Sequence, residues 1–270
     1  MSIVVCVPVT KAHKKHTPHL MEWYAANKAK HDLHLHWEID RPLHKVQASA
    51  VEVAKEIDAS HVLFTEHDQW AYPVDGLDVL LDDDKDVVGL PTYMRGYPFL
   101  PMCMHKVDPE ISFVTSERNL RSFYPTEVLQ ETDLITWAFT LVQTDVFRRF
   151  EEIGKTPWIW DKVPTDSHFC QLCEDLGIKR WINASYFVNH GDLPKEHVIF
   201  HRRMWDSIHA SEGVFHRSAK VKDDVTPQPQ NETDPHGVVP YRTEFEQILD
   251  AESVKVGQRV LLKKIEPVKA

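Results

Sequence analysis

The chain has 270 residues, of which 42% are hydrophobic, and a formal net charge of −10, so it contains enough apolar material for a large buried core. An acidic balance of this size argues against a protein whose main role is to coat nucleic acid or an anionic membrane. The four cysteines follow no secreted-type pattern, and Cys170 and Cys173 share a helix face without a second pair for zinc, so we expect reduced core thiols.

Neither a signal peptide nor a membrane span is recognisable. The apolar run 3–9 is short and lacks both a basic leader and a small-residue cleavage site. No apolar run approaches the roughly 18 residues that a spanning helix needs. We therefore expect a cytoplasmic protein without a membrane span.

Strands and helices alternate in the first third of the chain. A buried strand carries Pro8 and ends near Thr10, and the next helix has Thr17 as a plausible N-cap and Pro18 at its first position. The pattern continues with a strand at 33–39, a helix at 46–57, a strand at 61–64, a helix at 76–81 and a strand at 86–90. This alternation predicts an α/β fold with a mostly parallel central sheet.

The rest of the chain is less regular. Residues 93–109 read as irregular, and they are followed by a strand at 134–142, a helix at 145–153, an aromatic loop at 157–160, a capped helix at 166–177 and edge strands at 180–182 and 186–188. Beyond Arg203 the periodicity fades into a proline-rich stretch and a basic tail. We predict a main domain at 1–205 and a C-terminal extension at 206–270.

Two acids follow the strand at 61–64 directly. Glu66 and Asp68 are one residue apart, after an apolar run typical of a strand buried on both faces. Ligands of open α/β sheets gather at the carboxyl ends of the strands, and paired carboxylates there suit Mg²⁺ or Mn²⁺. The alternative is a solvated strand end that carries two acids by chance.

Several blocks, taken in order, resemble the GT-A fold glycosyltransferases, particularly the inverting family 2 type, over roughly residues 3–192. The resemblance rests on the opening strand with Pro8, on Asp40 after the second strand, on Lys45 with Ala48 and Ala50 after it, on Glu66-His67-Asp68, on Thr165-Asp166-Ser167-His168-Phe169-Cys170, and on His190. It implies a three-layer α/β/α sandwich that binds a UDP- or GDP-sugar donor.

The resemblance also implies roles for individual residues. Asp166 would be the base that deprotonates the acceptor hydroxyl, and the helix N-terminus would favour its charged form. Asp68 and His190, with Glu66 as a further ligand or as a ribose contact, would hold Mn²⁺ or Mg²⁺. The nucleotide would lie against a set of residues from the first half of the chain: Pro8, Thr10, Asp40, Lys45, Glu66 and Arg95.

Three positions depart from the family pattern. Glu66 replaces the first Asp of the D-x-D motif, and Thr165 stands where an acid often precedes the base. The glycine-rich approach to the acceptor is here Thr136-Trp137-Ala138-Phe139. Trp137, in this block, and Trp158 are the candidate acceptor-binding residues. Trp158 and Trp160 could stack against a sugar or acceptor ring, although tryptophans in loops more often close a core.

Other interpretations stay open. A nucleotidyltransferase, or a nucleotide-binding GT-A domain without turnover, fits the same acids. Asp166 could also be an ordinary residue at a helix start, and Arg95 part of a surface turn. The acceptor is undetermined, and a modified base in DNA is conceivable because of the basic tail.

Overall fold

The computed structural model describes the chain up to residue 190, with short gaps. The described residues are 1–9, 17–66, 69–70, 72–93, 101–110, 112, 120–159 and 163–190, with residues 17, 18, 70, 189 and 190 described by their main chain alone. The predicted domain boundary at residue 205 and the extension at 206–270 lie outside this part. Within it, no helix has the length and apolar character required to cross a membrane.

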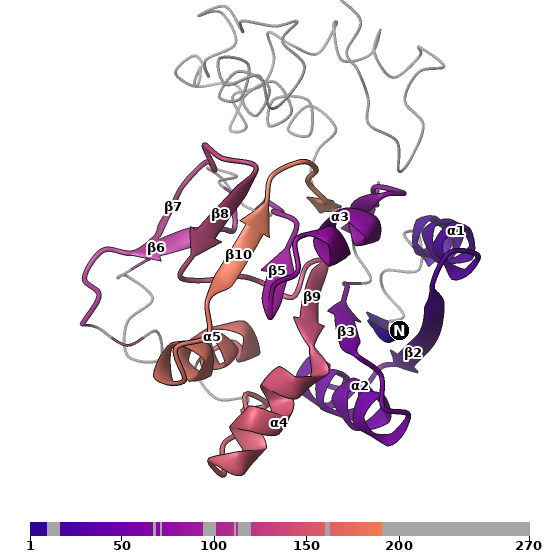
Figure 1. Ribbon diagram of the computed structural model, residues 1–270, viewed down its shortest axis with the longest axis horizontal. Coiled ribbons are helices and arrows are strands. Elements are labelled where there is room, and N and C mark those ends of the chain that lie inside the picture. Colours follow the sequence, from indigo (N-terminus) through magenta and orange to yellow (C-terminus); the bar gives the residue numbers. More distant parts are fainter. Residues whose placement is uncertain are drawn as a thin grey trace, which may run out of the picture.

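A seven-stranded sheet forms the centre of the molecule (Figure 1). Its spatial order is β2 (Asp32–Ile39), β1 (Ser2–Val9), β3 (His61–Phe64), β9 (Thr140–Gln143), β5 (Val87–Gly89), β10 (Arg180–Asn183) and β8 (Leu129–Thr132). The pairings make β2, β1, β3, β5 and β10 run in one direction, while β9 and β8 run in the other. The prediction of a mostly parallel sheet is therefore confirmed.

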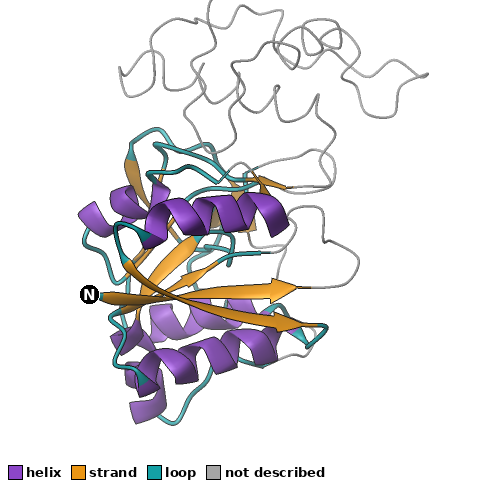
Figure 2. Cartoon of the chain, turned by 90° about the vertical axis from the view of Figure 1, so that its right-hand side faces the viewer, coloured by secondary structure: helices purple, strands orange, loops and turns teal. Residues whose placement is uncertain are grey.

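Helices cover both faces of this sheet (Figure 2). One face packs against α1 (Thr17–Lys28) and α3 (Gly76–Asp82), and the other against α2 (Leu43–Glu56), α4 (Thr144–Glu152) and α5 (Thr165–Asp175). Successive residues of β1 contribute to opposite cores, since Val5 belongs to the first and Cys6 to the second. A strand with both faces buried explains the unbroken apolar run at the start of the sequence.

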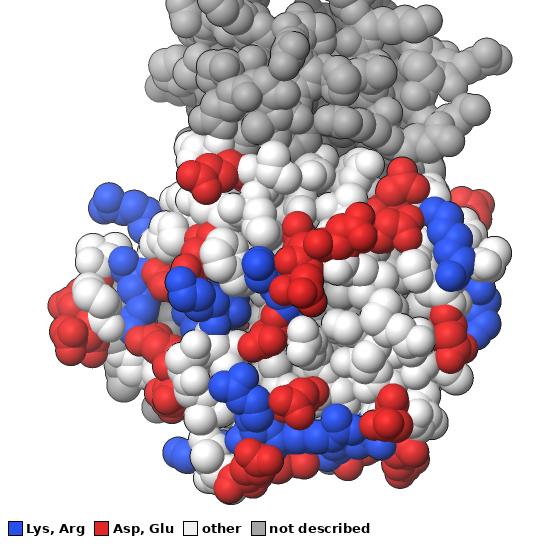
Figure 3. Space-filling model, in the orientation of Figure 1, with Lys and Arg blue, Asp and Glu red and all other residues white. Residues whose placement is uncertain are grey.

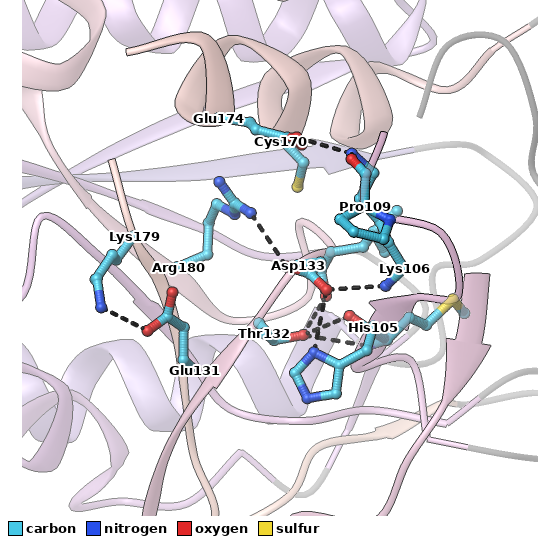
Figure 4. Close-up of polar contacts among 12 residues, drawn as sticks. His105, Lys106, Pro109, Glu131, Thr132, Asp133, Cys170, Glu174, Lys179 and Arg180 are labelled. Carbon is cyan, nitrogen blue, oxygen red and sulfur yellow. Dashed lines mark hydrogen bonds and ion pairs between the residues drawn. The ribbon is translucent and has the colours of Figure 1, made fainter. Parts of the chain in front are cut away.

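Two small sheets lie beside the central one. β4 (Gln69–Trp70) pairs with β11 (Asn189–His190), and β6 (Met104–Lys106) pairs with β7 (Leu120–Ser122). The second pair is tied to the main body by a polar network (Figure 4). The buried Lys106 ammonium lies 2.7 Å from Glu174 of α5, and the Lys106 N–H donates to Asp133, which also faces the Arg180 guanidinium at 3.8 Å.

The surface carries both signs of charge, and acidic and basic side chains lie next to one another on the face in Figure 3. Several of these neighbours are ion pairs between separate elements. Lys55 of α2 contacts Glu151 of α4, and Arg148 of α4 lies 3.1 Å from Asp58. Such exposed pairs contribute little stability individually, so the buried cores dominate the energetics.

Some predicted elements were wrong in extent. The apolar run 134–142 is a strand only from Thr140, because Phe139 has a positive φ of 54° that breaks an extended conformation. Residues 186–188 do not form the expected edge strand, and β11 begins directly after them, at Asn189. Helix α5 ends before Gly177 at φ +67°, as the glycine predicted, but its N-cap residue is Pro164 with no side-chain cap.

Candidate active site

The carboxyl ends of the parallel strands lie at one edge of the sheet, and the direction in which strands are added reverses between β1 and β3. From β1 the chain leads through α1 to β2 on one side, whereas from β3 it leads through α3 to β5 on the other. Open α/β sheets bind ligands at such switch points. Asp40 follows β2, Lys45 lies in the first turn of α2, and Glu66 follows β3, so all three belong to this edge.

The first turn of α5 lies at the same edge of the sheet. This helix leads into β10, which is parallel to β5, so its first turn lies at the carboxyl end of the sheet. Residues before the antiparallel β9 also lie there, because Thr140 pairs with the last residue of β3 and of β5. The topology thus brings Asp166 and Trp137 to the edge that carries the acids.

Asp40 occupies a distinctive backbone position. Its φ is 55°, a left-handed conformation that Asp tolerates better than most residues. The Asp40 N–H donates to Val9 O at 2.8 Å, so the end of β2 is held beside the end of β1, and the side chain is exposed. An exposed carboxylate at this edge of the sheet is suited to receive hydrogen bonds from a ligand.

The strand before Asp40 is secured by a polar cluster around Glu38. Its carboxylate accepts hydrogen bonds from Ser49 of α2 and from Arg41, and His36 lies 3.0 Å away. Burial tends to raise the pKa of Glu38, but the hydrogen bonds from Ser49, Arg41 and His36 outweigh it and lower the pKa below its usual value. The charged Glu38 carboxylate therefore links β2 to α2 through its hydrogen bond from Ser49.

The acidic loop after β3 is closed by main-chain contacts. Thr65 donates both its N–H (3.1 Å) and its hydroxyl (3.0 Å) to Cys6 O, which extends the β1–β3 pairing to the edge. The Tyr72 hydroxyl donates to Glu66 O at 2.7 Å. Burial, and after it the charge of Glu66, raises the pKa of Tyr72 well above its usual range, so this hydroxyl keeps its proton.

Gln69 closes the loop from its other end. Its main-chain N–H donates to Glu66 O, and its side-chain oxygen accepts from the Glu66 N–H, each at 3.4 Å. In the β4–β11 pair the main chain of Gln69 lies opposite that of His190. The late histidine is therefore adjacent to Gln69, the residue after the two acids, through the pairing of β11 with β4.

Asp166 lies in the first turn of α5 and is partly buried. Its Oδ1 accepts the main-chain N–H of Ser167 at 2.8 Å, but it is not the cap of the helix, since Pro164 takes that position. A carboxylate at the first turn of a helix is electrostatically favoured in its charged form.

The two tryptophans proposed for the acceptor both pack into the core on the α2 side of the sheet. Trp137 is 3% exposed, with its ring 4.4 Å from that of Phe64 and 4.6 Å from that of Phe169. Trp158 is partly buried and stacks on Phe147 with ring centroids 5.7 Å apart. This packing matches the interpretation of tryptophans that close a core. Pro8 is likewise buried within β1.

Part of the predicted site lies outside the described residues. This applies to Thr10, Asp68 and Arg95, and nothing is described of the His190 side chain. Among the side chains that the structure does describe, no group of three His, Cys, Asp or Glu residues could hold a metal ion. The metal ligands therefore stay predictions.

Sequence reasoning missed the residues that hold the site in place. Glu38, Gln69 and Tyr72 belong to no motif, and their contacts depend on which strands become neighbours. A buried Gln47 in α2 bonds to Thr165, whose departure from the family pattern was the one visible signal. These supporting residues are recognisable only from the fold.

Comparison with known proteins gives distant similarities. No protein-family model and no curated protein matches the chain. Among solved structures, the chain is similar to A197 from STIV, with 14% identity, a TM-score of 0.40, and coverage of 67% of this chain and 81% of that one. It is also similar to the nucleoside-diphosphate-sugar pyrophosphorylase from Vibrio cholerae RC9, with 10% identity, a TM-score of 0.37, and coverage of 74% and 99%.

Proposed function

We propose that this chain is a metal-dependent glycosyltransferase with a GT-A-like three-layer fold. It would move a sugar from a UDP- or GDP-sugar to an acceptor hydroxyl with inversion. The observation that carries the proposal is the convergence of Asp40, Lys45, Glu66 and Asp166 on the sheet edge that contains the switch point between β1 and β3. These residues come from four separate blocks of the sequence, and a shared edge is what a common ligand requires.

In this mechanism Asp40 and Lys45 hold the nucleotide at the carboxyl edge of the sheet. Asp166 takes the proton of the acceptor hydroxyl as its oxygen forms a bond to the anomeric carbon of the sugar. The bond from that carbon to the diphosphate oxygen breaks, and the electron pair leaves with the diphosphate. A Mn²⁺ or Mg²⁺ ion held by Asp68, His190 and Glu66 would supply the charge that stabilises this leaving group.

Titration calorimetry tests the proposal directly. UDP and GDP are each titrated into the wild-type protein with Mn²⁺ and with EDTA, and into Asp68→Asn. We expect one nucleotide to bind only with Mn²⁺, and this binding to be lost in Asp68→Asn. Asp145→Asn is the matched control, because Asp145 is exposed in the first turn of α4, which follows the opposite end of β9.

Calorimetry and two activity assays distinguish the competing interpretations. Absence of binding by both nucleotides to the folded protein would refute the proposal. Release of pyrophosphate from a nucleoside triphosphate and a sugar phosphate would instead identify a nucleotidyltransferase. Metal-dependent binding without consumption of any nucleotide sugar would identify a binding domain.

A further inference from the structure

A buried hydrogen-bond network joins α2, the segment before β9 and the start of α5. The Trp137 indole N–H donates to Thr165 Oγ1, and the Thr165 hydroxyl donates to Gln47 Oε1, each over 3.0 Å. Exposure is 3% for Trp137, 2% for Thr165 and 1% for Gln47. The Thr165 hydroxyl thus accepts one hydrogen bond from the indole, which can only donate, and gives its single proton to the Gln47 oxygen.

This network holds the first residue of α5. The helix begins at Thr165, after Pro164, which provides no side-chain cap. Trp137 contacts the helix twice on one face, through Thr165 and through the Phe169 ring one turn later, at 4.6 Å between ring centroids. Two contacts on one face fix the rotation of a helix about its axis. Consecutive residues of a helix are separated by about 100° around this axis, so the direction of Asp166, the residue after Thr165, is fixed as well.

The hydrogen-bond network also includes α2, which carries Lys45, a proposed nucleotide contact. Gln47 lies in α2 two residues after Lys45, and both follow Asp40 closely. A shift of Thr165 would therefore change the distance between the start of α5 and the start of α2. These two helix starts carry the proposed base and a proposed nucleotide contact.

We propose that Thr165 is a positioning residue. Through its hydrogen bonds to Gln47 and Trp137 it fixes the position of Asp166 relative to the donor site. The inference rests on the proposed function, in which Asp166 is the base. It also explains why a neutral residue stands at position 165. A carboxylate in this 2% exposed position would be a buried charge, and the two side chains that bond to Thr165, those of Trp137 and Gln47, are both neutral.

The first test needs no ligand. Thr165→Val keeps the shape of the side chain and removes the hydroxyl, whereas Thr165→Ser keeps the hydroxyl. In protein labelled with ¹⁵N-tryptophan, eight indole signals are expected, one per tryptophan, and Trp137→Phe identifies the signal of Trp137. We expect that signal to move upfield in Thr165→Val and to stay near its position in Thr165→Ser. An unmoved signal in Thr165→Val would overturn the network.

The second test separates positioning from folding. Release of nucleoside diphosphate from the donor sugar is followed for both variants, with the folded fraction measured by circular dichroism. We expect kcat to fall about tenfold or more in Thr165→Val, since small misplacements of reacting groups are costly. The affinity for UDP or GDP should change by less than about twofold, and Thr165→Ser should restore kcat.

The outcomes distinguish the two proposals. An unchanged kcat per folded molecule in Thr165→Val would overturn the positioning role and leave the glycosyltransferase proposal intact. A wild-type protein that consumes no nucleotide sugar would remove the proposed function, and the role of Thr165 in catalysis with it. The indole signal would still decide whether the network exists.

Discussion

The main chain of His190 lies directly opposite that of Gln69, in the antiparallel pair that joins β11 to β4. These residues are far apart in the sequence, and Gln69 is the residue that follows Asp68. The late histidine is thus paired with the residue that directly follows the two acids in the sequence. The proposed metal ion, shared by His190 and Asp68, can be tested by experiment.

His190→Ala should weaken the Mn²⁺-dependent binding of UDP or GDP at least tenfold. The reason is the loss of an imidazole ligand, since even an outer-sphere partner of a metal contributes about tenfold to a hundredfold in affinity. The β4–β11 pairing uses main-chain atoms, so the fold should be retained. Calorimetry with Mn²⁺ and with EDTA measures the effect, and His34→Ala on the exposed side of β2 is the control. Equal affinities in Mn²⁺ for wild type and His190→Ala would contradict the metal role.

Asp166→Asn should lower kcat about a hundredfold or more, which is the usual contribution of a general base. The asparagine oxygen can still accept the Ser167 N–H, so α5 should begin in the same place. Nucleotide affinity should therefore change little. Release of nucleoside diphosphate from the donor sugar measures kcat, and Asp175→Asn at the exposed end of the same helix is the control. Normal turnover by Asp166→Asn would exclude this residue as the base.

The elements that depend on local pattern could be predicted from the sequence. The apolar run of β1, the alternation in β2 and the amphipathic face of α2 each specify one element, and their order implies a mostly parallel sheet. The acids after β2 and β3 could be placed at one edge because parallel strands end there. The mixed α/β fold follows from these features, as the pairings confirm.

The remaining features depend on contacts between distant residues. β6 and β7 pair across an intervening segment and have no apolar run, so nothing local marks them as strands. The run 134–142 is apolar throughout, and periodicity cannot reveal that Phe139 turns to a positive φ. Trp137 illustrates the same limit at the site. Its type suggested an acceptor contact, whereas its packing and its bond to Thr165 are visible only in the fold.

Asp40→Asn should separate the backbone role of this residue from its charge. Asparagine tolerates a φ of 55° as well as aspartate does, so the free energy of unfolding should stay within about 0.5 kcal/mol of wild type. Loss of the carboxylate should weaken nucleotide binding about tenfold, because hydrogen bonds to a charged group are the stronger ones. Urea unfolding and calorimetry measure the two quantities.

Asp40→Val is the complementary variant. A β-branched residue is strained in the left-handed conformation, and the expected loss of stability is about 1–2 kcal/mol. If Asp40→Asn were destabilised as much as Asp40→Val, the side chain would serve the fold and not the ligand.

Glu38→Gln should make the protein less stable at neutral pH and less sensitive to acid. The folded-state pKa of Glu38 is lowered below the usual value of 4.5, because the hydrogen bonds from Ser49, Arg41 and His36 outweigh the effect of burial. Such a group contributes stability that is fully present above its unfolded pKa and is lost as the pH falls through its folded pKa. We expect Glu38→Gln to lose about 1–2 kcal/mol at pH 7, the scale of a hydrogen-bonded charge.

Urea unfolding at pH 7 and at successive values below pH 4.5 measures this difference. The difference in free energy of unfolding between wild type and Glu38→Gln should become smaller as the pH falls, because protonation of Glu38 removes the charge that distinguishes the two proteins. Glu152→Gln, an exposed change at the end of α4, should follow wild type at every pH. A gap that stays constant with pH would mean that shape and packing, and not the charge of Glu38, hold β2 against α2. The carboxylate would then have no part in fixing the strand end that presents Asp40.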